Sequence, residues 1–239
     1  TPLFPHKPFI APVNRLDTPV SGIMLLAFSA QAQTLLSQAF KTGSVEKEYW
    51  AICERSAVHS AETSEPQRLE HWLGFHTKTQ KAFIGTASAG TTPPSAGITK
   101  PKKNKKPTLK HAVLYWTLCG KGDRYDFIRI SPETGRTHQI RIQMAAAGHP
   151  IKGDLKYGAR RSDPNGGIRL HAYKLSFIHP VTHKNITVKA PPVQPDTLWQ
   201  ACTEICLNDT PFTNKEQAKS GTAKDIPASC GQIDPERRP

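Results

Sequence analysis

Alternating hydrophobic and polar residues predict strands in two parts of the chain. The stretch "VEKEYWAICE" alternates in this way and places Lys47, Tyr49, Ala51 and Cys53 on one side of a strand. Further along, "HAVLYWTLC" and "RYDFIRIS" read as two more strands, joined by the turn sequence "GKGD". These stretches are therefore expected to form three strands.

A shorter apolar run, "IMLLAFS", predicts a buried strand that leads directly into a helix. Ser29 is suited to cap that helix, whose sequence is "AQAQTLLSQAFKTG" and which ends at Gly43. One predicted face of this helix is apolar and carries Leu35, Leu36, Ala39 and Phe40. The pattern thus predicts a buried strand followed by a helix with one apolar face.

A second helix is predicted after the turn sequence "PETG". Thr137 is placed to cap it, and the helix is expected to cover residues 138–147 and to stop at Gly148. Its apolar stripe consists of Ile140, Met144 and Ala147. Arg136 precedes the N-terminus and Arg141 lies one turn inside, where a guanidinium can meet a carboxylate or phosphate. Two surface arginines on a solvated helix are the alternative.

Two segments lack any pattern that would bury them. Residues 86–110 contain six lysines and no acid, which predicts a mobile basic loop rich in Lys and Pro. From about residue 207 the periodicity disappears again, which predicts a loosely ordered tail over 207–239. We therefore expect one domain over residues 1–206, with a loop inserted in it and a tail behind it.

The charge of the chain points to an anionic partner. Its 239 residues carry a formal net charge of +13, with 37% hydrophobic residues. Such a field favours polyanions, with nucleic acid as the first expectation and an anionic membrane surface as the second. The longest apolar run is far too short to span a bilayer, so we expect no membrane-spanning segment.

The cysteines favour a reducing compartment. There are five, an odd number, and they are scattered along the chain, which is typical of free thiols rather than of a disulfide framework. Cys202 and Cys206 can share a helix face, but no second pair of ligands lies near them in the sequence. We therefore expect a cytoplasmic protein without a metal site.

A charged pair stands beside the first apolar run. In "NRLDTPVSG", Arg15 and Asp17 precede a segment that is predicted to enter the core. A buried carboxylate is costly unless it is paired or hydrogen-bonded. Asp17 is therefore either a structural anchor or a reagent, and its position alone does not decide between them.

Four stretches together resemble the RluA family of RNA pseudouridine synthases. They are "NRLDTPVSG", "VEKEYWAI", "PETGRTHQIRIQMAAAGHPIKGDLKYG" and "RLHAYKLSFIHPVT", in the family's order over residues 11–190. The resemblance implies an α+β fold with a long mixed, mostly antiparallel sheet, flanking helices and a central active-site cleft. It also implies an isomerase that breaks the glycosidic bond of a uridine in RNA, turns the uracil and rejoins it through C5, with no cofactor and no metal.

The resemblance also assigns roles to three residues. Asp17 stands at the position of the family's catalytic aspartate, where it would act as a nucleophile or as the base that removes a sugar proton. Arg141 matches the arginine that pairs with this aspartate and keeps it charged. Tyr49 matches the active-site tyrosine that stacks on the target base. Asp17, Tyr49 and Arg141 are thus the expected catalytic residues.

Four further residues are expected to contact RNA. Arg15 would shape the Asp17 loop or the displaced RNA, Arg136 and His138 would contact phosphate or ribose, and Leu170 would line the uracil pocket. The expected substrate is ribosomal or transfer RNA, and the expected state is a monomer. A catalytically silent RNA-binding module on the same fold, or an unrelated nuclease or hydrolase that uses Asp17, are the alternatives.

The sequence departs from the family pattern in several places. Asn14 stands where the family has histidine, and we expect it to hydrogen-bond the loop as well. Only 13 residues precede Asn14, whereas the family has a further strand before this motif, so either that strand is not included or the chain is cut. The basic loop is also longer than is typical of the family.

Overall fold

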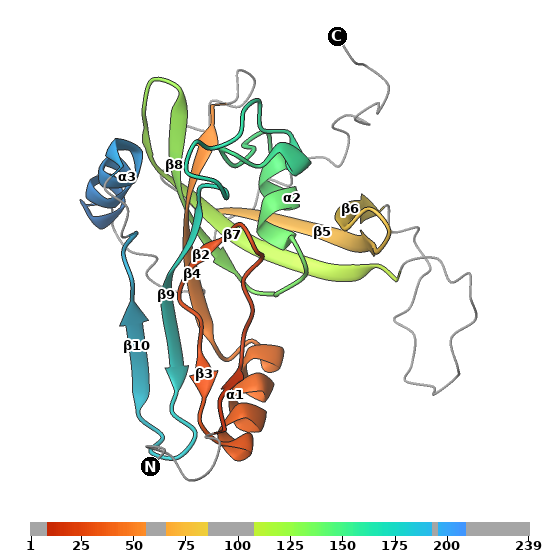
Figure 1. Ribbon diagram of the computed structural model, residues 1–239, viewed down its shortest axis with the longest axis vertical. Coiled ribbons are helices and arrows are strands. Elements are labelled where there is room, and N and C mark those ends of the chain that lie inside the picture. The colour runs from red at the N-terminus through yellow and green to blue at the C-terminus, as the bar shows by residue number, and fades with distance from the viewer. Residues whose placement is uncertain (1–8, 56–65, 86–107, 193–195, 209–239) are drawn as a thin grey trace, which may run out of the picture.

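The computed structural model describes residues 9–55, 66–85, 108–192 and 196–208 (Figure 1). Its strands are β1 (Ala11–Pro12), β2 (Ser21–Gly22), β3 (Leu26–Ala27), β4 (Glu46–Glu54), β5 (Gln67–His76), β6 (Lys81–Gly85), β7 (Lys110–Lys121), β8 (Tyr125–Pro132), β9 (Leu170–Ile178) and β10 (Asn185–Lys189). Its helices are α1 (Ala30–Thr42), α2 (Gln139–Ala146) and α3 (Thr197–Asn208), with a short 3₁₀ turn, η1 (Leu155–Tyr157).

One large sheet forms the centre of the described part of the protein. Its strand order is β10-β9-β4-β8-β7-β5-β6, and every neighbouring pair along this path is antiparallel. The short strand β2 adds a parallel pairing on β9. Figure 1 shows β4, β9 and β10 running along the length of the molecule, while β5 and β7 cross it obliquely. The predicted α+β fold with a mostly antiparallel sheet is confirmed.

The two faces of β4 enter different cores. Ala51 and Cys53 pack in the cluster that contains Met144 of α2, whereas Trp50 and Ile52 pack in the cluster that contains α3. Successive side chains of a strand point to opposite faces of the sheet, so α2 and α3 cover opposite sides. The predicted alternation along this strand is therefore confirmed.

The first helix was predicted well, but the strand before it was not. The Ser29 side chain accepts a hydrogen bond from the N–H of Ala32, and Gly43 ends α1 in the left-handed conformation. Leu36 is buried as expected, whereas Leu35 is 46% exposed. Only Leu26–Ala27 form a strand, and Leu26 itself is exposed, so the predicted buried strand is wrong. An apolar run of this length does not tell whether a sheet partner is available.

The start of the second helix also differs from the prediction. The helix begins at Gln139, and His138 occupies the N-cap in the left-handed conformation without a side-chain cap. Thr137 is exposed and does not cap the helix. Instead, the Gln139 side chain accepts hydrogen bonds from the N–H of Arg136 and the hydroxyl of Thr134. The predicted cap was wrong because a side chain inside the helix turns back to bind the preceding turn.

Strand β2 holds the segment after Asp17 against β9. Gly22 has a φ of +119°, and a Cβ there would lie 2.4 Å from the carbonyl oxygen of Ala172. Beside it, Ser21 hydrogen-bonds Nδ1 of His171 at 2.8 Å, and Nε2 of His171 donates to the Ala190 carbonyl at 2.6 Å. This close approach of two backbones requires glycine, and it fixes where the Asp17 loop ends.

Some predictions fall partly or wholly outside the described residues. The basic loop was predicted to extend to Lys110, but Lys110 already pairs with Leu73 as the first residue of β7, and 86–107 lie outside the described part. Helix α3 continues to Asn208, and the rest of the predicted tail lies outside as well. Among the described residues no helix is long and apolar enough to cross a membrane.

The cysteines of the described part form no disulfide among themselves. Cys202 and Cys206 do share a face of α3, with their Sγ atoms 3.9 Å apart in the core. In the described ranges no group of three or more His, Cys, Asp or Glu side chains is placed to hold a metal ion.

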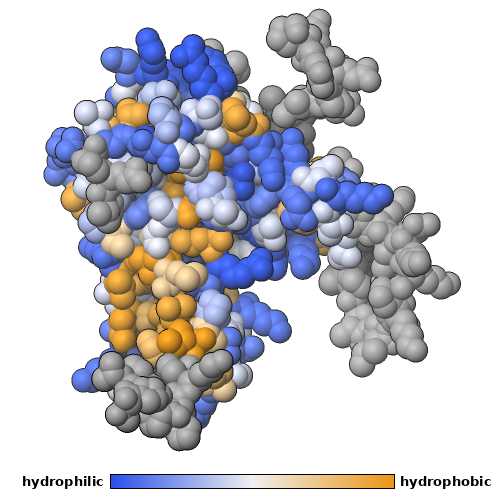
Figure 2. Space-filling view, viewed as in Figure 1, coloured by the Kyte–Doolittle hydropathy of each residue, from blue (hydrophilic) through white to orange (hydrophobic). Residues whose placement is uncertain are grey.

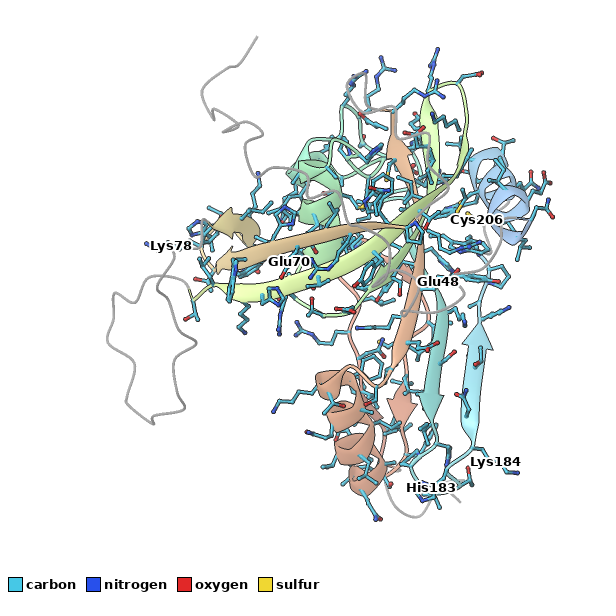
Figure 3. All side chains as sticks on the ribbon, turned by 180° about the vertical axis from the view of Figure 1, so that it is seen from behind. Glu48, Glu70, Lys78, His183, Lys184 and Cys206 are labelled. Carbon is cyan, nitrogen blue, oxygen red and sulfur yellow. The ribbon has the colours of Figure 1, made fainter. Side chains whose placement is uncertain are left out.

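Seen from behind in Figure 3, Cys206 lies on α3, far from the β9–β10 turn that carries His183 and Lys184.

Candidate active site

A cleft of about 800 Å³ opens where the Asp17 loop, α1, β4 and the start of α2 meet. All seven residues that the sequence singled out line this cleft: Arg15, Asp17, Tyr49, Arg136, His138, Arg141 and Leu170. They come from four separate stretches of the chain, which the sheet brings together. Figure 2 shows hydrophilic residues in a band across the middle of one face, with a hydrophobic area below it.

The Asp17 carboxylate projects into the cleft from a tight turn. The N–H of Val20 donates to the Asp17 carbonyl at 2.8 Å, and β2 follows immediately. Before the turn, the side-chain oxygen of Asn14 accepts a hydrogen bond from the N–H of Leu25 at 2.7 Å. This bond ties the residue before the turn to the segment that follows β2. The Asp17 side chain remains 25% exposed, so it is partly desolvated and still accessible.

The guanidinium of Arg141 is shared between two carboxylates. Its Nη1 lies 3.4 Å from Oδ2 of Asp17, which places the predicted pair together. Its Nε and Nη2, however, donate to the two oxygens of Asp154 at 2.6 and 2.7 Å. Burial lowers the pKa of Arg141, but the hydrogen bonds to Asp154 and the charge of Asp17 raise it by more. The arginine therefore stays charged. The stronger pair is therefore with Asp154.

Tyr49 and Leu170 form the apolar side of the cleft. Tyr49 lies on β4 opposite Ala172 of β9, and Leu170 pairs with Ala51 two residues further on. Burial, together with the nearby charge of Asp17, raises the pKa of Tyr49 to about 12. The ring therefore keeps its proton at neutral pH, and it offers a flat apolar surface next to the carboxylate.

The remaining predicted residues surround Asp17 at different depths. Arg15 and Arg136 are exposed at the rim, and Nε of Arg136 donates to the His111 carbonyl at 2.9 Å. His138 lies deeper, with its side chain 12% exposed and its Nε2 3.9 Å from Oδ2 of Asp17. The rim thus carries positive charge, and the interior holds an acid between an arginine and a histidine.

A comparison with known protein families decides the family. Residues 2–146 match the model described as RNA pseudouridylate synthase, which is more than half of the chain. The chain belongs to the RNA pseudouridylate synthase family. The predicted resemblance to the RluA group within it is confirmed by the relatives that match.

Curated pseudouridine synthases match over most of the chain. The uncharacterized RNA pseudouridine synthase YjbO of Bacillus subtilis is 34% identical over 75% of this chain and 54% of its own length. The tRNA pseudouridine synthase C of Haemophilus ducreyi is 31% identical over 76% of this chain and 72% of its own. The ribosomal large subunit pseudouridine synthase D of Vibrio cholerae is 30% identical over 75% of this chain and 51% of its own length. The chain spans about half the length of the first and third of these relatives.

Solved pseudouridylate synthase structures share the fold. The human RNA pseudouridylate synthase domain containing 1 superposes with a TM-score of 0.58 over 85% of this chain and 82% of its own, at 23% identity. The human RNA pseudouridylate synthase domain containing 4 superposes with a TM-score of 0.56 over 82% of this chain and 75% of its own, at 16% identity. At these identities the likeness concerns the fold alone.

Sequence reasoning missed four side chains that the pseudouridylate synthase fold brings to the site. Lys41 and Lys47 line the cleft, and Asp154 and Tyr157 lie behind it in contact with Arg141 and His138. The stretch "KGDLKYG" belongs to the third motif, but the resemblance gave no role to its acid or its tyrosine. A buried arginine requires a carboxylate partner, and an acid in this stretch, shortly after α2, was the signal available in the sequence.

Proposed function

We propose that this chain converts a uridine in RNA to pseudouridine in the cleft that Asp17 enters. The reaction breaks the bond between C1′ and N1, turns the uracil, and forms a bond between C1′ and C5, while C5 loses a proton and N1 gains one. The observation that carries the proposal is the placement of Asp17 within reach of Arg141 and beside Tyr49, in a member of this family.

Asp17 is proposed as the reagent. As a nucleophile it would attack C1′, and as a base it would remove a proton from the sugar; both uses require an ionised carboxylate next to the ribose. Arg141 places an opposite charge 3.4 Å from Oδ2 of Asp17 in a partly dry site. A role as a structural anchor is less well supported, because Oδ2 receives only one long hydrogen bond from the described residues.

Tyr49 and Leu170 are proposed to hold the flipped uracil. A base that leaves its stack needs an aromatic or apolar surface to replace its neighbours. Tyr49 offers such a ring beside Asp17, and the buried Leu170 lies on the same face of the sheet. The protonated phenol adds no charge to the pocket, because its pKa is raised to about 12.

The rim residues are proposed to bind the RNA backbone. Arg15, Lys41, Lys47 and Arg136 line the cleft, and all of them except the half-buried Lys47 are exposed. Cations at such a rim attract phosphates and release counterions when they bind them. Ribosomal or transfer RNA is the proposed substrate, since relatives carry both names. The monomeric state and the cytoplasmic location stay predictions.

The direct test uses RNA from cells that lack the gene. This RNA is incubated with the wild-type protein, and its pseudouridines are mapped before and after. We expect a small number of new pseudouridines at defined uridines. RNA that is bound but acquires no pseudouridine would contradict the proposal and would favour the silent RNA-binding module instead.

A further inference from the structure

One short turn behind the cleft contacts both side chains that face Asp17. This turn comprises Asp154 and the 3₁₀ segment that ends at Tyr157. Asp154 forms the paired hydrogen bonds to Arg141, and the Tyr157 hydroxyl lies 2.7 Å from Nδ1 of His138. Arg141 and His138 in turn both approach the same carboxylate oxygen, Oδ2 of Asp17, at 3.4 and 3.9 Å.

Asp154 fixes the direction of the arginine. Its side chain is 1% exposed, and its backbone accepts from the N–H of Ala159 at 3.0 Å and donates to the Ile151 carbonyl at 2.9 Å. Because Asp154 occupies Nε and Nη2 of Arg141, the edge of the guanidinium that carries Nη1 is left to face Asp17. The planar group therefore cannot rotate without losing a buried ion pair.

Tyr157 fixes the tautomer of the histidine. Its buried hydroxyl accepts a hydrogen bond from the N–H of Ala82 at 2.7 Å. Burial raises the pKa of Tyr157 to about 12, so the hydroxyl keeps its one proton. Among the described residues, Nδ1 of His138 is the other group within hydrogen-bond distance of the hydroxyl, so the hydroxyl donates to it. The proton of a neutral His138 ring then resides on Nε2.

The surroundings of His138 favour the same tautomer. An unprotonated Nε2 would direct its lone pair at the Asp17 carboxylate, whereas a protonated Nε2 presents a donor. Desolvation lowers the pKa of His138 more than the charge of Asp17 raises it, so the ring is neutral at pH 7. The residue is held in the left-handed backbone conformation with φ of 55°, and Phe75 packs edge-on against its ring.

We propose that Asp154 and Tyr157 are positioning residues. Asp154 orients Arg141, and Tyr157 holds His138 as the Nε2–H tautomer. Arg141 and His138 then both present N–H groups to Oδ2 of Asp17 and leave its Oδ1 to face the uridine. The assignment rests on the proposed function of the cleft. It gives the "KGDLKYG" stretch a role in orienting the reactive carboxylate, in addition to its role in the fold.

The first test reads the tautomer directly and needs no RNA. Nitrogen NMR of the protein labelled with ¹⁵N-histidine separates the Nε2–H, Nδ1–H and doubly protonated forms of His138. We expect the Nε2–H form at pH 7 in the wild type and a mixture in Tyr157→Phe. Tyr125→Phe, which lies outside the cleft, is the control and should leave the His138 signals unchanged. A wild-type His138 in the Nδ1–H or the charged form would overturn the proposal.

The second test is kinetic. At saturating RNA, the single-turnover rate of Tyr157→Phe should fall about tenfold or more, while RNA affinity changes less than about twofold. The charged and titratable groups that face His138 are Asp17, Arg141, Asp154, Lys156 and Tyr157. Without the Tyr157 hydroxyl that donates to Nδ1, the neutral form of His138 is less favoured, so the pKa of His138 should rise. The acid limb of the pH–rate profile should then move to higher pH. A loss of fold alone would not move this limb.

The two tests separate the two proposals. If the wild type makes no pseudouridine, the proposed function fails, and the NMR measurement still decides whether Tyr157 sets the tautomer. If the wild type is active but Tyr157→Phe retains its full rate, pH profile and tautomer, the positioning role is wrong and the proposed function stands. Asp154→Asn keeps the shape of the turn and weakens the hold on Arg141, so it should lower the rate without altering the His138 tautomer.

Discussion

Arg141 must serve two carboxylates with one planar group, and this requirement sets what can replace it. Its Nε and Nη2 hold Asp154 while Nη1 faces Asp17, so three separate N–H directions are in use. A lysine ammonium is a point charge and cannot bridge two acids in this fixed geometry. The side chain therefore matters for its shape as well as for its charge.

Replacing Arg141 by lysine should lower the single-turnover rate at least about tenfold, which corresponds to about 1.4 kcal/mol in the barrier. The charge is kept, but the fork that aims at Asp17 is lost. Arg160→Lys is a matched control, because Arg160 is exposed and pairs only loosely with Glu54. Equal rates for Arg141→Lys and the control would contradict the paired arrangement.

The residues that the sequence could identify are those with a family motif around them. Asp17, Tyr49 and Arg141 came from the motifs, and the structure brings all three to one cleft. The pairing of Arg141 with Asp154 could not be found in the same way, because it depends on how a turn folds back behind a helix. The left-handed backbone of His138 was equally out of reach, since only a small fraction of histidines adopt this conformation.

At the scale of elements, the site depends on the contact between β2 and β9. This pairing is only two residues long, yet it carries the Asp17 loop to the sheet. The Ser21–His171–Ala190 hydrogen bonds tie three segments together at the same place. The two backbones approach closely at Gly22, so this contact should be sensitive to a single added methyl group.

Gly22→Ala should destabilise the protein by about 2–5 kcal/mol, because a left-handed φ costs about 1–2 kcal/mol and overlap with packed atoms about 1–3 more. The overlap arises because the new Cβ would lie 2.4 Å from the Ala172 carbonyl oxygen. Denaturant unfolding measures the decrease in the free energy of unfolding.

Gly166→Ala is the matched control for this prediction. Gly166 also has a left-handed φ, of +73°, but nothing lies within 4 Å of its Cβ position. Its replacement should therefore lower the free energy of unfolding by only about 1–2 kcal/mol. Equal decreases at the two positions would show that the backbones of β2 and β9 are not held in close contact.

Elements with a regular pattern of apolar residues could be predicted from the sequence, whereas short contacts between distant segments could not. The strands β4, β7 and β8 and helix α1 follow from alternation, caps and spacing. In contrast, "IMLLAFS" is as apolar as a core strand, yet Met24 and Phe28 are exposed. Whether an apolar run is buried depends on which distant segment covers it, and local pattern does not contain that information.

At the scale of the whole molecule, the net charge of +13 is the main feature. Some of the positive side chains lie at the cleft, where Arg15 and Arg136 are exposed. Another group lies in the sequence between β6 and β7, outside the described residues. Its lysines are Lys100, Lys102, Lys103, Lys105 and Lys106. Both groups can contribute to RNA affinity, and salt dependence separates their contributions from the chemistry.

Replacing these five lysines by glutamine should flatten the dependence of RNA affinity on salt, by about 0.7–0.9 of a slope unit for each phosphate that the variant no longer neutralises. The single-turnover rate at saturating RNA should hardly change, because Asp17, Tyr49 and Arg141 do not belong to this segment of the sequence. Replacement by arginine preserves the charge and serves as the control. An unchanged salt slope in the glutamine variant would mean that this segment does not bind RNA.

The most direct test of the central claim is tritium release from RNA labelled at C5 of uridine, because each turnover replaces the hydrogen on that carbon. Asp17→Asn keeps the size of the side chain but can act neither as nucleophile nor as base, so we expect no detectable release. RNA affinity and thermal stability should stay close to wild type. Asp123→Asn, which changes an exposed acid outside the cleft, should release tritium at the wild-type rate. Release by Asp17→Asn within tenfold of wild type would contradict the assignment of Asp17 as the reacting group.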